Sequence, residues 1–210
     1  MRLDTKYPGV GIALGGSRNA TRRVAIVGLG AGTLATYGRR GDFFRFYEIN
    51  PAVVLAAAES FHFLRDSEAK TDVVTGDGRL MLDREPPRSF DMVVLDAFSD
   101  DAIPVHLLTR EAFKMYFDRL RPDGLLAIHL SNRYLDLNAE VQALAAGLRK
   151  VVLRIYSAAD PAQGTESADW AIVAGNRDNL ITLRPYEAPP SPRKVQAWTD
   201  QHSSLFPLWK

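Results

Sequence analysis

A glycine-rich turn and a distant acid are the first residues whose types and spacing suggest chemistry. Gly28, Gly30 and Gly32 follow a short apolar run and form the pattern GxGxG. Gly28 and Gly30 would let the backbone turn tightly against a ligand, and Gly32 would let a following helix press on a sheet. Glu48 follows Gly28 by 20 residues, where an acid ending a second strand can hydrogen-bond two ribose hydroxyls. Together they predict an adenosine site with Ile49 in its wall, although each part alone also suits a structural corner or a solvated strand end.

The glycine pattern also indicates which adenosine compound the turn would hold. Dinucleotide-binding turns end in glycine or alanine at a position that is Thr33 here. They also leave helix N–H groups open to a pyrophosphate. We therefore expect a ligand without phosphates, either S-adenosylmethionine or its decarboxylated form, rather than NAD. We expect no metal ion in this site.

Asp77 and Gly78 lie in a second glycine-flanked turn, after another apolar run. Ligands of open α/β sheets bind at the carboxyl ends of the strands, so we expect this turn to lie near the first. Asp77 would then accept a hydrogen bond from the adenine amino group, and the adjacent backbone N–H would contact a ring nitrogen. A plain turn in which Asp77 caps its own backbone is the alternative.

Three carboxylates follow the fourth predicted strand: Asp96, Asp100 and Asp101. Such a cluster suits a cationic amine, because carboxylates bind the amine and one of them can remove its proton before attack on an electrophilic carbon. A desolvated carboxylate with a raised pKa would serve best as that base. Asp96 leaves a buried strand directly and is the favoured base, whereas Asp100 and Asp101 equally suit caps of the next turn. His106 suits either a second base or a surface loop residue, and we favour the loop residue.

Ser131 and Asn132 follow the fifth predicted strand and should face the same cleft. They would orient a substrate or, equally well, satisfy the exposed end of the strand. His129 lies inside that strand, and we expect it to be a core residue.

Apolar runs bounded by turn residues alternate with amphipathic stretches, which is typical of an α/β protein with a parallel sheet. Helices are expected after Pro51, after Thr109 as N-cap, and over 139–148. A turn at 122–124 would lead into the fifth strand. The predicted strands are 24–28, 43–48, 72–75, 90–96, 125–130, 151–156 and 170–174. We expect a seven-stranded sheet, mostly parallel with an antiparallel closing strand, and helices on both faces.

Composition excludes several classes of protein. The 210 residues are 46% hydrophobic and 24% charged, with a net charge of +1 and no cysteine. These values exclude a disordered chain, a disulfide scaffold and a protein that coats nucleic acid through bulk charge. No apolar run approaches the ~20 residues that span a bilayer, and no signal peptide is apparent. We expect a cytoplasmic protein without membrane insertion or nucleic-acid partner.

We divide the chain into a body, residues 1–184, and a C-terminal tail, residues 185–210. The tail begins with a segment that holds Pro185, Pro189, Pro190 and Pro192, and it ends in apolar residues. Prolines at this density prevent regular structure throughout. We expect the tail to dock on the body, or alternatively to form a homodimer contact.

As an ordered set, the segments GLGAGTLATY, FRFYEINPAVV, TGDGRL, FDMVVLDAFSDDAIPVHLLTREAF, LRPDGLLAIHLSNRYLDL and WTDQHSSLF resemble the spermidine synthase-like proteins. The nearest resemblance is to the soluble C-terminal half of bacterial fused transporter/spermidine synthase proteins. It implies a Rossmann-like class I methyltransferase fold and transfer of an aminopropyl group from decarboxylated S-adenosylmethionine to putrescine. It also implies that Gly28, Gly30 and Gly32 form the donor loop, with Asp96 or a following acid as base and Tyr7 at the substrate.

The sequence departs from spermidine synthases at identifiable positions. Their glycine turn holds an aspartate for the donor's amine, where this chain has Ala31. Their fourth-strand loop continues as DxxDP, whereas AFS follows Asp96, and PG follows Tyr7 in place of glutamine and glutamate. We also expect their N-terminal β-hairpin domain to be absent. Three hypotheses remain: an aminopropyltransferase, an S-adenosylmethionine-dependent methyltransferase, and a non-catalytic nucleoside-binding or partner-binding module.

Overall fold

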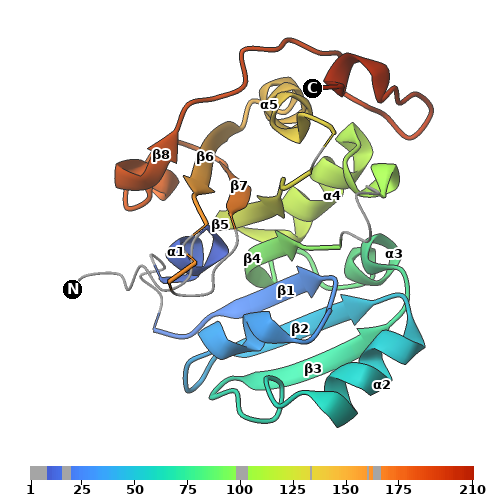
Figure 1. Ribbon diagram of the computed structural model, residues 1–210, viewed down its shortest axis with the longest axis vertical. Helices are drawn as coiled ribbons and strands as arrows, with labels where there is room; N and C mark the ends of the chain where they lie inside the picture. Colours follow the sequence, from blue (N-terminus) through green and yellow to red (C-terminus); the bar gives the residue numbers. More distant parts are fainter. Residues whose placement is uncertain (1–8, 16–19, 98–103, 133, 160, 163–166) are drawn as a thin grey trace.

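The described part of the chain forms one mixed sheet in a computed structural model (Figure 1). This part comprises residues 9–15, 20–97, 104–132, 134–159, 161–162 and 167–210. The strand order is β3-β2-β1-β4-β5-β7-β6-β8. The strands are β1 (Arg23–Val27), β2 (Phe43–Glu48), β3 (Lys70–Thr75), β4 (Phe90–Leu95), β5 (Leu120–His129), β6 (Val151–Ser157), β7 (Ala168–Ala174) and β8 (Glu187–Ala188).

The sheet confirms the predicted fold class. Strands β1 to β5 pair in parallel, whereas β7 pairs antiparallel with both β5 and β6. The strand that the prediction lacked is β8, two residues of the tail that pair with β6. Because β1 to β4 run the same way, their carboxyl ends, and the loops that follow them, gather along one edge of the sheet.

Alternation along the central strands divides the apolar core into two layers. In β1, Val24 and Ile26 pack on one face of the sheet, and Ala25 and Val27 pack on the other. The first layer lies under α1 (Val10–Gly15), the 3₁₀ helix η1 (Thr33–Tyr37) and α2 (Pro51–Ser60). The second lies under α3 (Gly78–Asp83), α4 (Arg110–Arg119) and α5 (Leu137–Gly147). Helices on both faces are therefore confirmed.

Local sequence signals account for the helix starts. The Asn50 side chain accepts a hydrogen bond from the N–H of Ala52 at 3.0 Å, and Pro51 occupies the first turn of α2. Thr109 caps α4 in the same way, through the N–H of Ala112 at 3.2 Å.

The helix expected after the glycine turn is present as the short 3₁₀ helix η1, which ends at Gly38 after a few residues. One local prediction is wrong. Residues 122–124 form no turn before β5 but belong to it. The β4–β5 register shifts between Phe90 and Met92, and the extra residues of β5 bulge outward.

The tail passes over α5 and ends beside it (Figure 1). Trp198 and Leu208 are buried in the core layer that α5 covers. The N–H of Trp198 donates to Glu140 Oε1 of α5 at 2.7 Å, and the N–H of Asp136 donates to the carbonyl of Leu208 at 2.8 Å. These contacts hold the tail against the body, while the division of the chain at residue 184 stays a prediction.

Helices of the described segments are all too short or too polar to cross a lipid bilayer.

Candidate functional site

A cavity of about 450 Å³ lies at the carboxyl ends of the parallel strands. Its wall also includes the start of α3 and the 3₁₀ helix η2 (Val105–Leu107). The predicted site residues that line it are Gly28, Gly30, Glu48, Ile49, Asp77, Gly78 and Asp96. Gly32, Ser131 and Asn132 are not part of its lining. Tyr7, Asp100 and Asp101 lie outside the described residues, so their predicted roles stay predictions.

The glycine turn follows β1 and packs closely against the end of β4. Gly28 has φ +98°, and a Cβ there would lie 2.2 Å from the carbonyl oxygen of Asp96. A side chain at this position would therefore push the two strand ends apart. Gly30 has φ +52° with open space around its Cα, which leaves the turn accessible from the cavity.

The packing role expected of Gly32 belongs to Gly78. A Cβ on Gly32 would meet Leu64 at 3.1 Å, away from the sheet, and its φ of +83° suits the start of η1. A Cβ on Gly78 would lie 2.4 Å from Cγ1 of Val27 in β1. The absent side chain thus lets α3 pack closely on the central sheet and places the turn before it at the cavity.

Glu48 ends β2 with its carboxylate fixed by backbone N–H groups. Oε2 accepts a hydrogen bond from Leu29 of the glycine turn at 3.1 Å, and Oε1 accepts one from Asn50 at 2.9 Å. Glu48 is 9% exposed and faces the cavity. Each ionised carboxylate oxygen has room for a second donor. The group can therefore accept two neighbouring ligand hydroxyls without reorganisation.

Asp77 has both of its carboxylate oxygens in use. Oδ1 accepts from the N–H of Leu80 at 2.9 Å and caps α3, as the structural alternative predicted. Oδ2 lies 3.1 Å from Nε2 of His106. His106 is half exposed, as expected of a loop residue, and yet it lines the cavity. Contact between Asp77 and an adenine amino group stays a prediction.

Asp96 follows β4 and pairs with a histidine of the neighbouring strand. Its Oδ1 lies 2.9 Å from Nδ1 of His129. The expectation that His129 is a core residue is wrong: the imidazole is 26% exposed and stacks on Trp170 of β7. Because Leu95 pairs with Ile128 in the β4–β5 register, the next residues of both strands are neighbours. The order of the strands, which the sequence did not fix, was needed to find this pair.

Ser131 and Asn132 mainly complete the end of β5. Asn132 Oδ1 accepts backbone hydrogen bonds from Leu135 at 2.7 Å and Tyr134 at 2.9 Å. Ser131 Oγ accepts one from the N–H of Asp169 at 3.0 Å and lies 2.9 Å from His129 Nε2. Ser131 thus reaches the site only through His129.

Tyr47 of β2 forms part of the cavity wall and is a further residue that the sequence did not single out. Its hydroxyl donates to Glu85 Oε1 at 3.0 Å, and Arg45 binds the same carboxylate. Burial and the nearby charge of Glu85 raise the pKa of the Tyr47 phenol far above its usual range. Tyr47 therefore stays a neutral, fixed part of the wall rather than a proton carrier.

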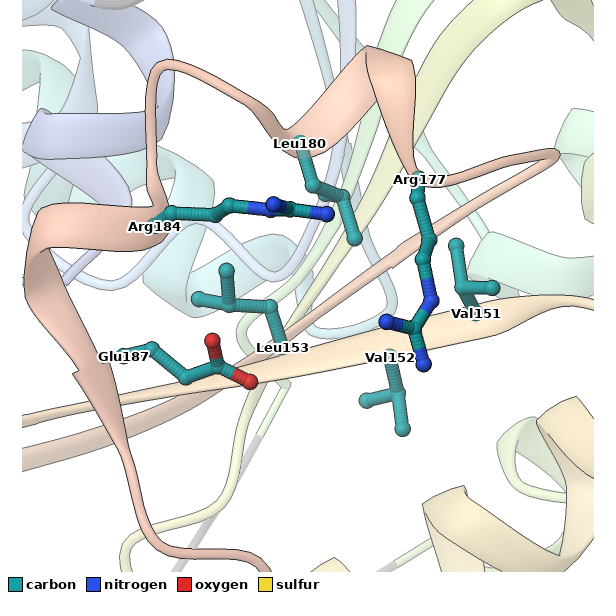
Figure 2. Close-up of a pocket in the computed structure, with 7 residues that line it drawn as sticks. All are labelled: Val151, Val152, Leu153, Arg177, Leu180, Arg184 and Glu187. Atoms are coloured by element: carbon teal, nitrogen blue, oxygen red, sulfur yellow. The ribbon is translucent and has the colours of Figure 1, made fainter.

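A second hollow, of about 360 Å³, lies on the other half of the sheet beside β6. Figure 2 shows Arg177 and Arg184 extending over it from two directions, above Leu153 and opposite Glu187. It contains no glycine turn and no strand-end carboxylate of the parallel half. The predicted adenosine site is the first cavity, not this one.

Within the described ranges, no three His, Asp or Glu side chains are placed to share a metal ion. The first cavity is lined by Glu48, Asp77 and Asp96, and its volume is large enough for an organic ligand.

Sequence comparison gives two polyamine aminopropyltransferases. The chain is 32% identical to the Vibrio vulnificus protein over 109 residues, which are 50% of this chain and 36% of that one. It is 28% identical to the Thermococcus kodakarensis protein over 122 residues, 58% of this chain and 41% of that one. This chain is similar to the polyamine aminopropyltransferases. The matched stretch covers well under half of these relatives' own length. No protein-family model matches the chain.

Solved structures show that the chain has the methyltransferase-like fold. A probable spermidine synthase from Corynebacterium glutamicum superimposes with a TM-score of 0.66 at 19% identity, covering 94% of this chain and 79% of that one. A spermidine synthase in complex with the transition-state analogue AdoDATO gives 0.56 at 15% identity, over 90% and 67% of the two chains. Human methyltransferase-like protein 13, in complex with SAH, gives 0.55 at 19% identity, over 87% and 86%.

Proposed function

We propose that the protein is a spermidine synthase-like transferase. It would take decarboxylated S-adenosylmethionine as donor and pass its aminopropyl group to an amine such as putrescine. One observation carries the proposal: a single cavity gathers Gly30, Glu48, Asp77 and Asp96 from the ends of four neighbouring strands. The sequence likeness to polyamine aminopropyltransferases supports the same reaction class.

The donor's nucleoside fits the acceptors in the cavity wall. The two ribose hydroxyls would donate to the carboxylate of Glu48, which the backbone already holds in place. The adenine amino group would donate to Asp77, whose position is fixed by its cap on α3. The exposed apolar side chain of Ile49 would cover one face of the nucleoside. This orientation directs the sulfonium end toward Asp96.

Asp96 would act as the general base. Its Oδ2 accepts no hydrogen bond from the described residues, and it would take a proton from the substrate ammonium. The freed nitrogen lone pair then attacks the propyl carbon bonded to sulfur. A C–N bond forms, the C–S bond breaks, and its electron pair returns to sulfur, which leaves as neutral methylthioadenosine. Asp96 then releases its proton to water. Asp100 and Asp101 would add negative charge for the amine.

Calorimetry and a transfer assay test this function. We expect decarboxylated S-adenosylmethionine and methylthioadenosine to bind, and to stabilise the protein against heat by mass action. We expect methylthioadenosine release when putrescine is added, and a polyamine series would identify the preferred acceptor. If neither nucleoside binds, the protein is a module without this site, and the proposal is wrong.

One observation favours a second candidate function, methyl transfer from S-adenosylmethionine. Ala31 of the glycine turn carries no carboxylate to bind the amine of a decarboxylated donor or to repel the carboxylate of S-adenosylmethionine. Parallel assays with the two donors distinguish the reactions. Aminopropyl transfer predicts methylthioadenosine as product, whereas methyl transfer predicts S-adenosylhomocysteine.

A further inference from the structure

Asp96 is held by a chain of side-chain contacts that runs away from the cavity. Oδ1 of Asp96 meets Nδ1 of His129 at 2.9 Å, and Nε2 of His129 meets Oγ of Ser131 at 2.9 Å. Both imidazole nitrogens are therefore engaged. Among the described residues, only Oδ1 of the Asp96 carboxylate has a side-chain partner, which leaves Oδ2 for a ligand.

The partners on either side determine where the imidazole protons lie. An ionised carboxylate only accepts hydrogen bonds, so Nδ1 must carry a proton and donate it to Asp96. In the neutral ring, Nε2 then accepts from the hydroxyl of Ser131. Ser131 Oγ can do this while accepting the N–H of Asp169 at 3.0 Å, because a hydroxyl has one donor and two acceptor sites. The contacts thus select the Nδ1–H tautomer, as the orienting groups of other histidines do.

Packing fixes the plane of the ring as well. The imidazole stacks on the indole of Trp170, with centroids 4.7 Å apart and planes inclined by 12°. Trp170 is buried, and it pairs with His129 across the β5–β7 ladder. Two hydrogen bonds and one rigid stacking partner leave the ring a single orientation.

The Asp77–His106 pair provides a contrast within the same cavity wall. His106 meets Asp77 through Nε2 at 3.1 Å, and its side chain is 50% exposed, against 26% for His129. Its other ring nitrogen has no hydrogen-bond partner among the described residues. Asp77 is also oriented by its cap on α3, which does not depend on the histidine. Asp96 has no such cap, so His129 is its only orienting side chain among the described residues.

We propose that His129 is the positioning residue of Asp96. It holds Oδ1 so that Oδ2 faces the reacting amine, and Ser131 holds His129 in the Nδ1–H tautomer. The catalytic consequence rests on the function proposed above, whereas the positioning itself does not.

Among the described residues, the strands beside β5 carry two charged groups at this end, Asp96 itself and Asp169 of β7. The carboxylate of Asp169 is bound by both the Nε and Nη2 atoms of Arg154 in β6, at 2.8 and 2.6 Å. The charge of Asp169 is thereby compensated, and Asp96 is the carboxylate that the imidazole contacts.

The first test needs no enzymatic activity. The chain has four histidines, so imidazole ¹⁵N spectra can be assigned by single substitutions. We expect His129 to show the Nδ1–H tautomer when neutral, and to lose this preference in Asp96→Ala. Ser131→Ala should weaken the preference, whereas His62→Asn should leave it unchanged. A wild-type ring in the Nε2–H tautomer, or one indifferent to Asp96→Ala, would overturn the proposal.

The second test measures the consequence for transfer. We expect His129→Ala to lower kcat about a hundredfold, the effect of a reacting group misplaced by roughly 1 Å. The amine KM should change less than about threefold, because the side chain does not contact substrate. His129→Asn can again donate to Asp96 and should recover at least about tenfold of the loss. His62→Asn, at an exposed position outside the cavity lining, is the matched control.

The two tests separate this proposal from the proposed function. Equal kcat for His129→Ala and wild type would show that His129 does not position Asp96. Equal loss in the alanine and asparagine variants, with lowered thermal stability, would show a purely structural role. If the wild-type protein transfers no aminopropyl group, the proposed function fails, and the tautomer measurement alone then decides whether His129 holds Asp96.

Discussion

Glu48 and Glu140 are both buried carboxylates, but they lie in regions of opposite character. Glu48 has a backbone N–H on each oxygen and faces the open cavity. Glu140 has one N–H, from Trp198 of the tail, and its Oε2 has no partner in the part of the chain that the structure describes. Burial raises the pKa of Glu140 to about 7. At the cavity, the Glu48 carboxylate is held in place and is accessible to a ligand. Under the tail, the Glu140 carboxylate is enclosed by packed side chains and is not accessible.

This difference predicts which variants impair function and which change stability. Substitutions at the cavity should affect binding or turnover more than the free energy of unfolding. Substitutions under the tail should do the reverse. Measuring both quantities for each variant tests the comparison, and the four variants below are ordered by expected effect.

Asp96→Asn should produce the largest effect. Loss of the general base is expected to lower kcat by about 10³-fold, within the usual range for such groups. Donor affinity should stay nearly unchanged, and the free energy of unfolding should stay within about 1 kcal/mol of wild type, since Asp96 is partly exposed. Methylthioadenosine release, calorimetry and urea unfolding give the three values. Retained turnover would show that Asp96 is not the base.

Glu140→Gln should change stability and its pH dependence. Between pH 4.5 and about 7 the unfolded chain ionises Glu140 while the folded chain keeps it protonated. The folded state then binds more protons, so wild-type stability should fall as pH rises through this window and level off above it. Glu140→Gln has no ionisable group at this position, so its stability should not fall in this way. At pH 8 its free energy of unfolding should exceed that of wild type by up to about 3 kcal/mol. Urea unfolding from pH 4.5 to 8 measures the difference.

The control for Glu140→Gln is donor affinity, which should not change because the residue lies outside the cavity. Parallel stability curves for the two proteins across this pH range would contradict the account of Glu140.

Glu48→Gln should weaken donor binding. The amide keeps one acceptor oxygen for the backbone but loses the charge and the second acceptor that the ribose hydroxyls need. We expect a loss of about 2 kcal/mol, or roughly 30-fold in Kd, typical of a hydrogen bond to a charged group. Calorimetry with methylthioadenosine measures it. An unchanged Kd would remove Glu48 from the ribose.

Asp200→Ala should have the smallest effect. Its carboxylate binds Arg79 of α3 at 2.6 Å and accepts from Thr109 at 2.7 Å. The hydrogen bond from Arg79 lowers the pKa of Asp200 to about 2. Because the carboxylate is 43% exposed and screened by water, we expect a loss of about 1 kcal/mol or less at pH 7.

The effect of Asp200→Ala should be fully present above the ordinary carboxylate pKa and should disappear as pH falls through about 2. Acid titration of thermal stability checks the sign. A loss of donor affinity larger than the loss of stability would instead link the tail to the cavity, because Arg79 follows Gly78 in its wall.

The pattern of the sequence was sufficient for the sheet and for the cavity's main residues. The spacing of apolar residues and the turn residues between them located seven strands, because buried parallel strands are short apolar runs bounded by turn residues. Gly28, Glu48 and Asp77 were found because each follows such a strand, and the ends of parallel strands must share one edge of the sheet. No knowledge of contacts was needed for that step.

Features that depend on neighbours distant in sequence were missed or misread. The bulge at residues 122–124 depends on the register with β4, and the role of Gly78 depends on Val27 packing against it. The sequence pattern wrongly predicts His129 to be a core residue. A strand pattern alone does not show which groups of neighbouring strands lie beside the side chain at the end of a strand.

The amino-acid sequence by itself determined the element types and the positions of the strand-end acids, because both follow from local periodicity and chain direction. Only the tertiary structure decided how three acids are held: Glu48 by two N–H groups, Asp96 by His129, and Glu140 by the tail. Hydrogen-bond partners and burial are set by strand order and register, which bring together residues far apart in the chain.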